Sequence, residues 1–411
     1  MQRSADVLII GAGPAGAVAA ALLVQKGYSV IVLERSRFPR FSIGESLLPQ
    51  SVNFLKQAGM LDAVRKAGFQ YKDGAAFIWK DKYETFVFAD KSSEGPDSTY
   101  QVERAKFDDL LAKEAARMGA DVRFEHEIRS VDVSDPDQPR LDVLEPDGTQ
   151  VTYTARFLLD ASGFGRVLAR QLDLAVPSDF PSRVALFTHV QDNAAVDAFD
   201  RNKIQIVTHP EKRNIWYWLI PFPDGRCSLG VVASQEALDV ENNKHRLDAL
   251  LWDWVAEEPF LGSLLENAES LFPARFIGGY TSKVKHMQAP GYALLGNAGE
   301  FLDPVFSSGV TIAMHSAVLA SDVLDRHLQG ENVDWHAEFE VPMKNGIKTF
   351  TAYVRAWYDH SFQDIVYNSV HQPDIKRMIC SVLAGFAWDQ DNPFAKDASR
   401  RLGQLHALIS T

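Results

Sequence analysis

The sequence has few cysteines and no excess of positive charge, and both absences restrict what the protein does. Only two cysteines, Cys227 and Cys380, occur among 411 residues, and neither belongs to a CxxC pair. This excludes a zinc knuckle and a disulfide framework, and it favours a reducing, cytoplasmic setting. The 42 basic residues are outnumbered by 54 acidic ones, so the net charge is −12. We therefore expect no nucleic-acid partner and no attraction to an anionic membrane surface.

We also expect no membrane-spanning segment, although one stretch of the sequence resembles such a segment. Residues 7–24 carry no charge and are long enough to cross a bilayer. They contain three glycines and Pro14, which favour a strand, a turn and a helix instead. With 46% hydrophobic and 23% charged residues in 411, the chain is typical of a globular protein with two or three domains or one large composite.

The pattern of apolar residues predicts alternating strands and helices over much of the chain. Residues 5–10 form a buried strand, an Ala-rich helix continues to about Gln25, and residues 29–33 form a second strand. Residues 102–118 are expected to be helical, and residues 121–124, 131–144 and 156–159 to be strands. Residues 292–296 again have the composition of a buried strand, and a helix is expected from about Gly309. This alternation is typical of an α/β fold with a Rossmann-type nucleotide-binding domain.

Between residues 176 and 284 the composition changes to short β-like segments (183–190, 203–209, 214–221 and 227–232) followed by a helical stretch at 241–269. These segments predict an antiparallel sheet that forms a separate surface for a substrate. We predict a discontinuous nucleotide-binding domain (1–75, 100–175 and 285–330), a substrate domain (76–99 and 176–284) and a helical C-terminal segment (331–411). In that last segment, Phe350, Tyr353 and Trp357 share one helix face, which is typical of a core stripe more often than of a substrate lid.

The glycine pattern Gly11-x-Gly13-x-x-Gly16 lies between the first predicted strand and helix. The first glycine allows a tight turn, the second lets a pyrophosphate approach the backbone, and the third lets helix and strand pack closely. Glu34 follows the second strand 18 residues after Gly16, where a carboxylate accepts hydrogen bonds from ribose hydroxyls. Together these features predict a dinucleotide site.

A second cluster of small residues favours FAD over NAD as the dinucleotide. Gly296-Asn297-Ala298 and the segment from Asp303-Pro304 to Ser308-Gly309 precede another helix. Two distant segments of this kind suit a long ligand that is held at both ends. The sequence offers no positioned His and no Ser-Tyr-Lys set of the sort that an NAD-dependent dehydrogenase uses.

Four motifs together resemble the flavin-dependent halogenases, a branch of the FAD monooxygenases with the p-hydroxybenzoate hydroxylase fold. They are the GESLLP segment at residues 44–49, the segment GFQYKDGA at residues 68–75, the W-x-W-x-I-P signature at residues 216–221, and the loop from Asp303 to Gly309. The similarity extends over most of residues 1–320. The second motif resembles the stretch that holds the catalytic lysine in the phenol- and pyrrole-acting subgroup, which assigns that role to Lys72.

The resemblance implies a reaction and a set of site residues. Reduced FAD forms a hydroperoxide with O2, a chloride or bromide held near Ser308 and Gly309 attacks it, and hypohalous acid moves to Lys72, which passes the halogen to an electron-rich phenol or pyrrole. Trp216, Trp218 and Phe306 line the passage. A separate flavin reductase supplies FADH2, and the substrate is free or bound to a carrier protein. The motifs and the resemblance predict cofactor contacts from Gly11, Gly13, Ala15, Gly16, Glu34, Arg35, Ser46, Arg104, Asp160, Asn297, Asp303 and Pro304.

Departures from the family pattern leave alternatives open. Asn297 stands where the family usually has Asp, and Phe306 stands where the tryptophan-acting subgroup has Glu, so tryptophan is disfavoured as the substrate. Compact relatives of this kind are often described only as dehydrogenases or reductases. A monooxygenase or dehydrogenase on the same scaffold therefore remains the second reading, and a flavin-binding module without catalysis is a third.

Several of the residues singled out also have a plain structural interpretation. Lys72 suits a solvated lysine at a strand end, and Trp216 and Trp218 alternate as core residues of one strand do. Ser308 suits a helix cap, and Arg104 suits a surface ion pair. His189 and His209 have no ligand-like partners in the sequence, and we assign them no role.

Overall fold

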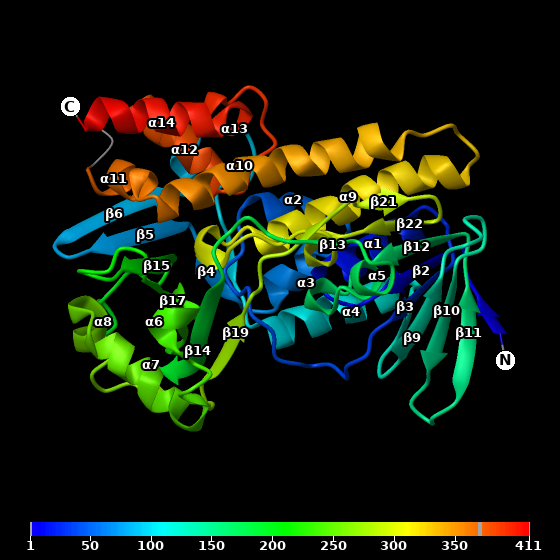
Figure 1. Ribbon diagram of the computed structural model, residues 1–411, viewed down its shortest axis with the longest axis horizontal. Helices are drawn as coiled ribbons and strands as arrows, with labels where there is room; N and C mark the ends of the chain where they lie inside the picture. The colour runs from blue at the N-terminus through cyan, green and yellow to red at the C-terminus, as the bar shows by residue number, and fades with distance from the viewer. Residues whose placement is uncertain (1, 369–371, 411) are drawn as a thin grey trace.

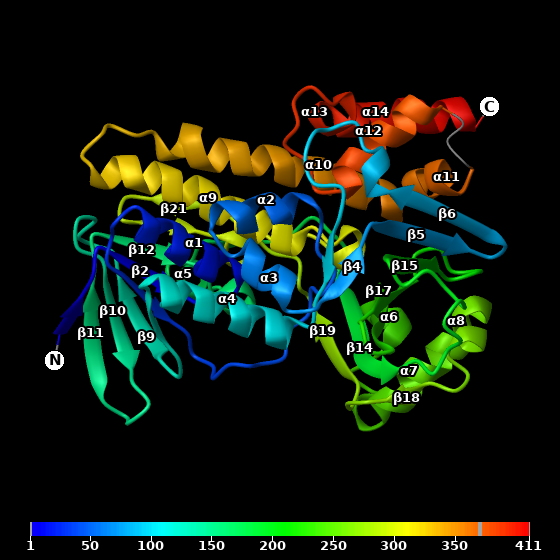
Figure 2. The same cartoon turned by 180° about the vertical axis from the view of Figure 1, so that it is seen from behind.

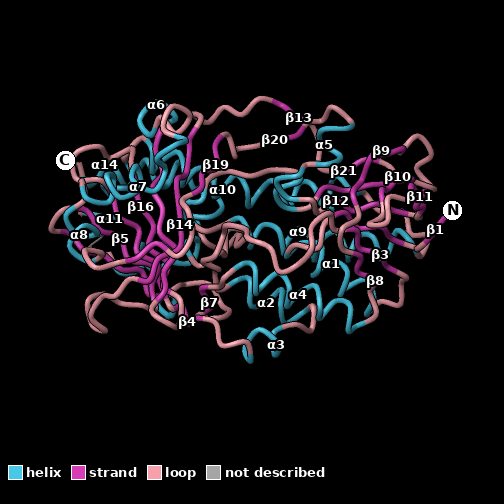
Figure 3. Tube along the Cα trace, turned by 90° about the horizontal axis from the view of Figure 1, so that it is seen from below, coloured by secondary structure: helices cyan, strands magenta, loops and turns pink. Residues whose placement is uncertain are grey.

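The computed structural model describes residues 2–368 and 372–410. Figure 1 shows an elongated molecule whose two termini lie at opposite ends of its long axis. The view in Figure 3 shows strands gathered toward both ends and long helices between them. The α/β fold class that we predicted is confirmed, and the strand ends that carry the motifs meet in the middle of the molecule.

The nucleotide-binding half is built on a six-stranded sheet with the order β21-β22-β12-β2-β3-β8. Its strands are Gln288–Ala289, Tyr292–Leu294, Phe157–Asp160, Val7–Ile10, Val30–Leu33 and Asp121–Arg123, and all pair in parallel except β21 with β22. The strands β2, β3 and β12 are buried throughout because helices cover the sheet, as their continuous apolar runs predict. Helices α1 (Pro14–Gln25), α4 (Arg104–Met118) and α9 (Gly309–Leu328) lie side by side in Figure 2.

A smaller sheet with the order β1-β11-β10-β9 extends from this half. Its strands are Gln2–Ser4, Gln150–Thr154, Arg140–Leu144 and Glu127–Asp132. We expected strand structure over residues 131–144, and the structure corrects those bounds to two antiparallel strands, β9 and β10. The turn between them contains Asp135, Pro136 and Asp137, which suit a turn and do not pair in the sheet.

The other half contains a larger sheet with the order β18-β14-β17-β16-β15-β5-β6, in which β19 also pairs with β14. Its main strands are β14 (Arg183–Gln191), β17 (Arg226–Ser234), β16 (Trp216–Pro221), β15 (Lys203–Thr208), β5 (Gly74–Trp79) and β6 (Lys82–Val87), with β18 (Glu269–Ser270) and β19 (Arg275–Gly278) at the edge. The predicted sheet is present but not wholly antiparallel, because β15 pairs with β5 in parallel. Helices α7 (Leu247–Ala256) and α8 (Pro259–Leu264) cover one face of it.

Between the two halves lies a short ribbon of β4 (Gln70–Lys72) and β7 (Thr99–Gln101). The C-terminal segment is helical, as predicted, with α10 (Val341–Tyr358), α11 (Ser361–Tyr367), α12 (Pro373–Leu383), α13 (Pro393–Lys396) and α14 (Ala398–Ile409). Figures 1 and 2 show α10 running alongside α9. Phe350, Tyr353 and Trp357 on α10 are each at most 1% exposed, so their stripe belongs to the core. No helix in the described part of the chain is long and apolar enough to cross a membrane.

Candidate functional site

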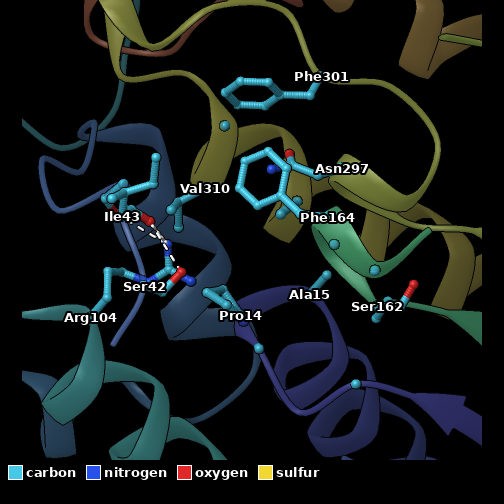
Figure 4. A pocket seen from close by; sticks show the side chains of 18 of the residues that line it. Pro14, Ala15, Ser42, Ile43, Arg104, Ser162, Phe164, Asn297, Phe301 and Val310 are labelled. Carbon is cyan, nitrogen blue, oxygen red and sulfur yellow. Dashed lines mark hydrogen bonds between the residues drawn. The ribbon is translucent and has the colours of Figure 1, made fainter. Parts of the chain in front are cut away.

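A cavity of about 530 Å³ lies where the carboxyl ends of β2, β3, β12 and β22 face the larger sheet. Ligands of open α/β sheets bind at this edge because the strand ends and the helix N-termini meet there. The lining comes from residues far apart in the sequence, among them Gly11, Glu34, Ala161, Trp216 and Asn297. Figure 4 shows this convergence, with Pro14 and Ala15 on one side and Phe164, Asn297 and Phe301 on another.

The glycine loop has the geometry that a pyrophosphate needs. Gly11 has φ of 93°, and a Cβ there would lie 2.6 Å from the carbonyl oxygen of Ala161. A Cβ at Gly16 would lie 1.9 Å from the carbonyl oxygen of Gly11, so only glycine lets α1 start so close to β2. A Cβ at Gly13 would meet only Nη2 of Arg40, at 3.7 Å. The space beside Gly13 is therefore open and has a cation at its edge, which fits a phosphate at the N-terminus of α1.

Glu34 lines the cavity at the end of β3, as the sequence predicts. Its carboxylate accepts hydrogen bonds from the backbone N–H groups of Ala12, at 3.0 Å, and Ser36, at 2.9 Å. The carboxylate thus links the glycine loop at Ala12 to the segment that follows β3 at Ser36. Arg35 and Ala15 also line the cavity.

Arg104 is not a surface ion pair. It is 8% exposed, lines the cavity and donates two hydrogen bonds to the fully buried carboxylate of Asp108, at 2.8 and 2.9 Å. It also donates to the carbonyl oxygen of Ile43 at 2.5 Å, one of the contacts drawn in Figure 4. Arg40 lies 3.2 Å from the same Asp108 carboxylate, so one buried acid holds two cations at the cavity wall. Our sequence reading missed Arg40, although it lies in the Arg-rich stretch that follows Glu34.

Asp160 and Asp303 organise the wall of the cavity from behind it. Asp160 is fully buried and accepts hydrogen bonds from the N–H groups of Ser162 and Leu168, which fixes the loop whose Ala161, Ser162 and Gly163 line the cavity. Asp303 accepts from the N–H of Val305 and so shapes the turn in which Pro304 and Ser307 line the cavity. Neither carboxylate is part of the lining, so their predicted contact with the cofactor remains a prediction.

A partly buried hydrogen-bond chain connects Asp303 with the tryptophan strand. The indole N–H of Trp216 donates to the hydroxyl of Tyr358, at 3.0 Å, and that hydroxyl donates to Asp303, at 2.9 Å. The Arg183 guanidinium stacks on the Tyr358 ring at 3.4 Å. Burial raises the pKa of Asp303 to about 6, against the lowering effect of the Val305 N–H, Tyr358, Arg183 and Tyr280. Tyr358 comes from α10, and no feature of the sequence indicated it.

Trp216 and Trp218 both line the cavity from β16, with their ring centroids 6.0 Å apart. The Trp218 ring lies over Gly230 of β17, where a Cβ would be 2.3 Å from it, so that glycine makes room for the indole. The two tryptophans are also in the core, at 1% and 6% exposed, so the structural and the functional interpretation hold together. Phe306, which we expected in the passage, does not line the cavity, because its ring packs against Tyr353, Trp357 and Phe362.

The predicted halide segment lies at the start of α9. Gly309 lines the cavity, and Asn297 lies beside it in the lining. Ser308 is 3% exposed and its side chain makes no capping hydrogen bond to this helix, so the simple cap interpretation is not supported. The first N–H groups of this 20-residue helix point toward the cavity end of its axis, where an anion is favoured.

Lys72 is buried, at 1% exposed, and does not line the cavity. The solvated-lysine interpretation is therefore wrong. Its Nζ donates to Oγ of Ser46 and to the carbonyl oxygen of Leu47, both at 2.7 Å, and it lies 5.3 Å from the centre of the Phe88 ring. Among the described residues it has no acidic partner, and desolvation by burial lowers its pKa to about 7. Ser46 does line the cavity, so it stands between the cavity and this lysine.

A second residue of the GESLLP segment has a partner that the sequence did not indicate. Glu45 lines the cavity, and its Oε1 lies 2.8 Å from Nε2 of His189 on β14. Both side chains are buried. His189, to which we had assigned no role, thus anchors the segment that carries Ser46.

Comparison with known proteins identifies the family. Residues 4–242 match the FAD binding domain family. The chain is 40% identical to a flavoprotein/dehydrogenase from Cytophaga hutchinsonii, whose structure has a TM-score of 0.94 and covers 99% of both chains. It is 30% identical to CmlS, a flavin-dependent halogenase, with a TM-score of 0.80 over 92% of this chain and 68% of that one. The chain belongs to the family of FAD-binding enzymes that includes the flavin-dependent halogenases.

A further relative is a 1H-pyrrole-2-carbonyl peptidyl-carrier-protein chlorinase of Pseudomonas fluorescens. It is 28% identical over 376 residues, which are 86% of this chain and 83% of the relative. The protein is thus an FAD-dependent oxidoreductase, as the glycine motif and the second small-residue cluster predicted. The cavity described above is the candidate site for this FAD, because the open space beside Gly13 and Arg40 suits a pyrophosphate.

Proposed function

We propose that this enzyme uses FADH2 and O2 to halogenate a small electron-rich aromatic compound, a phenol or a pyrrole, and that Lys72 is its catalytic lysine. The observation that carries the proposal is the buried contact between Lys72 and Ser46, since Ser46 also lines the flavin cavity. A buried lysine without an acidic partner is costly for a fold and is typical of a functional group.

Reduced FAD, when bound, would react with O2 and supply the oxidising equivalent that converts a halide to hypohalous acid. The overall reaction balances, because FADH2, O2, halide and one proton give FAD, water and hypohalous acid. Hypohalous acid and the aromatic C–H then give the halogenated product and a second water. The N–H groups at the start of α9, near Ser308 and Gly309, would hold the chloride or bromide.

Lys72 would receive the hypohalous acid beside Ser46. With a pKa of about 7, its side chain is part ammonium and part free amine at neutral pH. The ammonium donates a hydrogen bond to the oxygen of hypohalous acid, and this polarises the halogen toward the aromatic carbon. Trp216 and Trp218 would keep the organic substrate away from the flavin ring.

The partners of the reaction follow from the same proposal. A separate flavin reductase would supply FADH2, and a carrier-bound pyrrole is one candidate substrate, because the Pseudomonas relative is named for such a compound. The two buried cysteines, Cys227 and Cys380, suit the reducing cytoplasm that we expect as the location.

The test is a product assay with a reductase, a panel of phenols and pyrroles, free and carrier-bound, and chloride or bromide. We expect halogenated product from the wild-type enzyme and product at background from Lys72→Ala, with FAD binding and O2 consumption retained. Lys106→Ala, a change at an exposed lysine of α4, is the matched control and should keep full product. Halogenation by Lys72→Ala at the wild-type rate would contradict the role of Lys72.

The second candidate function is a monooxygenase or dehydrogenase without halogenation. One observation favours it: the structure with the 0.94 TM-score is that of a flavoprotein/dehydrogenase. Oxidised or hydroxylated product that forms at the same rate with and without halide would decide for this alternative.

A further inference from the structure

Two buried side-chain oxygens on β7 have no hydrogen-bond partner among the described residues. They are Oγ1 of Thr99, which is 1% exposed, and Oε1 of Gln101, which is 0% exposed. Buried polar atoms are paired in the large majority of cases, either within the protein or with an ordered water. Two such atoms two residues apart on one strand therefore indicate a missing partner.

The register of the strands brings both oxygens to Lys72. Lys72 lies directly opposite Thr99 in the β4–β7 ribbon, and Ser46 lies directly opposite Gln101 on the other edge of β7. Leu47 N–H bonds to Tyr100 and Val102 N–H bonds to Glu45, so Ser46 and Gln101 form a non-hydrogen-bonded pair, the kind with the closer side chains. Residues directly opposite each other carry their side chains on the same face.

The course of the lysine side chain follows from this register. It starts opposite Thr99 and ends 2.7 Å from Oγ of Ser46, opposite Gln101. It must therefore cross β7 on the face that carries Thr99 and Gln101, whereas Tyr100 points to the other face. Lys72, Thr99, Gln101 and Ser46 thus carry their side chains on one face of the ribbon. The amide Nε2 of Gln101 donates to the carbonyl oxygen of Arg201 at 3.1 Å, which leaves its Oε1 as the free acceptor on this face.

The unused donors and acceptors of these groups indicate which kind of molecule would satisfy their hydrogen bonds. The described contacts use two of the three N–H donors of the ammonium. Oε1 of Gln101 is an acceptor only, and the Thr99 hydroxyl both donates and accepts. An oxygen with one O–H donor and free lone pairs would satisfy all three groups, and the contacts of the ammonium itself are to a hydroxyl and a carbonyl oxygen.

We propose that Lys72, Ser46, Thr99 and Gln101 form a binding site for one small neutral O–H molecule. Its identity as hypohalous acid rests on the proposed function, and water is the other molecule with this chemistry. In the site, the ammonium and the Thr99 hydroxyl donate to the oxygen, and Oε1 of Gln101 accepts its hydrogen. Gln101 and Thr99 thereby act as binding residues for the halogen donor, and Ser46 joins the site to the flavin cavity.

The test combines a trapping assay with crystallography. Thr99→Val keeps the shape of the side chain and removes the hydroxyl, and Tyr100→Phe, on the opposite face of the same strand, is the matched control. With FAD, a reductase, O2 and bromide, we expect Thr99→Val to lose about tenfold in brominated product, as the loss of one hydrogen bond implies. The amount of free hypobromous acid, trapped by a soluble thiol, should rise by as much as the brominated product falls. O2 consumption should not change.

Gln101→Leu should act in the same direction, and the Thr99→Val/Gln101→Leu double variant should release nearly all of its hypobromous acid. Variants that brominate as the wild type does, with no trapped acid, would overturn the site and leave the proposed function intact.

The crystallographic arm does not depend on turnover. We expect an ordered water at hydrogen-bond distance from Nζ of Lys72, Oγ1 of Thr99 and Oε1 of Gln101 in the wild-type protein, and its loss in Thr99→Val. Absence of an ordered molecule in the wild type would overturn the site. If the wild type makes no halogenated product, the proposed function fails, and an ordered water that is lost in the variant would assign the site to water alone.

Discussion

Transfer of a lysine ammonium from water to a site that is 1% exposed costs free energy unless nearby charges compensate it. At the scale of single residues, this cost lowers the pKa of Lys72 from 10.5 to about 7, because desolvation acts there without a counterion. In the unfolded chain the lysine regains its ordinary pKa. Between these two pH values the unfolded state binds more protons than the folded state, so the folded protein becomes more stable as pH rises.

The change Lys72→Met tests this relation, because methionine has no proton to bind. The stability of the wild type relative to the variant should rise by about 1.4 kcal/mol per pH unit between roughly pH 7 and pH 10, the slope for one proton. Thermal denaturation of both proteins across this range measures the difference. Lys106→Met, at an exposed position, should show no such slope relative to the wild type. Parallel curves for Lys72→Met and the wild type would mean that Lys72 is not desolvated.

At the scale of elements, the turn after Asp303, the strand β16 and the helix α10 are joined by the chain from Trp216 through Tyr358 to Asp303. The chain couples the orientation of one cavity-lining tryptophan to the loop that leads into α9. Asp303 has a pKa of about 6, which burial raises and the Tyr358 hydrogen bond partly offsets. Below this pH the protonated carboxyl no longer needs the Tyr358 hydroxyl as a donor, so the loop loses one of its anchors.

Tyr358→Phe should therefore raise the pKa of Asp303 further and shift the acid limb of the kcat–pH profile to higher pH. Product formation near pH 6 should fall by about tenfold, the effect of one lost hydrogen bond to a charged group, with FAD still bound. The measurement is kcat from pH 5 to pH 9 at saturating substrate. Tyr353→Phe, at a fully buried tyrosine of α10 whose hydroxyl donates to the carbonyl oxygen of Phe394, is the control. If the acid limb does not shift in Tyr358→Phe, the protonation of Asp303 does not control the rate of the reaction.

At the scale of the whole molecule, the sequence predicts what depends on local pattern. The strand, glycine turn and helix at the start of the chain follow from periodicity, and the β16 strand follows from its alternation. The surroundings of Lys72 do not follow from local pattern. Ser46 lies 26 residues before Lys72, and Thr99 lies on β7, which pairs with the strand of Lys72 from a distant part of the sequence. The Trp216–Tyr358 contact spans 142 residues. The ring of Phe306 packs against Trp357 and other aromatic rings of the C-terminal helices, which no local pattern indicates, and its place in the passage stays a prediction. Local motifs identify the cofactor, whereas the contacts of Lys72, Trp216 and Phe306 depend on tertiary packing between distant segments.

The separation of the flavin cavity from the Lys72 site is the property of the whole molecule on which the proposed reaction depends. Trp216, Trp218 and Ser46 line the cavity, whereas Lys72 is not part of its lining and contacts Ser46 from behind. If the two indoles form the barrier, Trp216→Phe/Trp218→Phe should open a direct path to the flavin. Halogenated product should then fall, and hydroxylated product or released hydrogen peroxide should rise.

In a plain monooxygenase the substrate already reaches the flavin, so the same double variant would only lower hydroxylation. Product analysis and a peroxide assay, with and without bromide, distinguish the two cases. Full truncation of a buried tryptophan costs roughly 3–5 kcal/mol, and phenylalanine keeps part of the packing, so thermal stability is measured alongside. Trp252→Phe, on the half-buried surface of α7, controls for the loss of an indole. A double variant that stays folded, halogenates less and yields neither hydroxylated product nor peroxide would show that the indoles hold the substrate rather than exclude it.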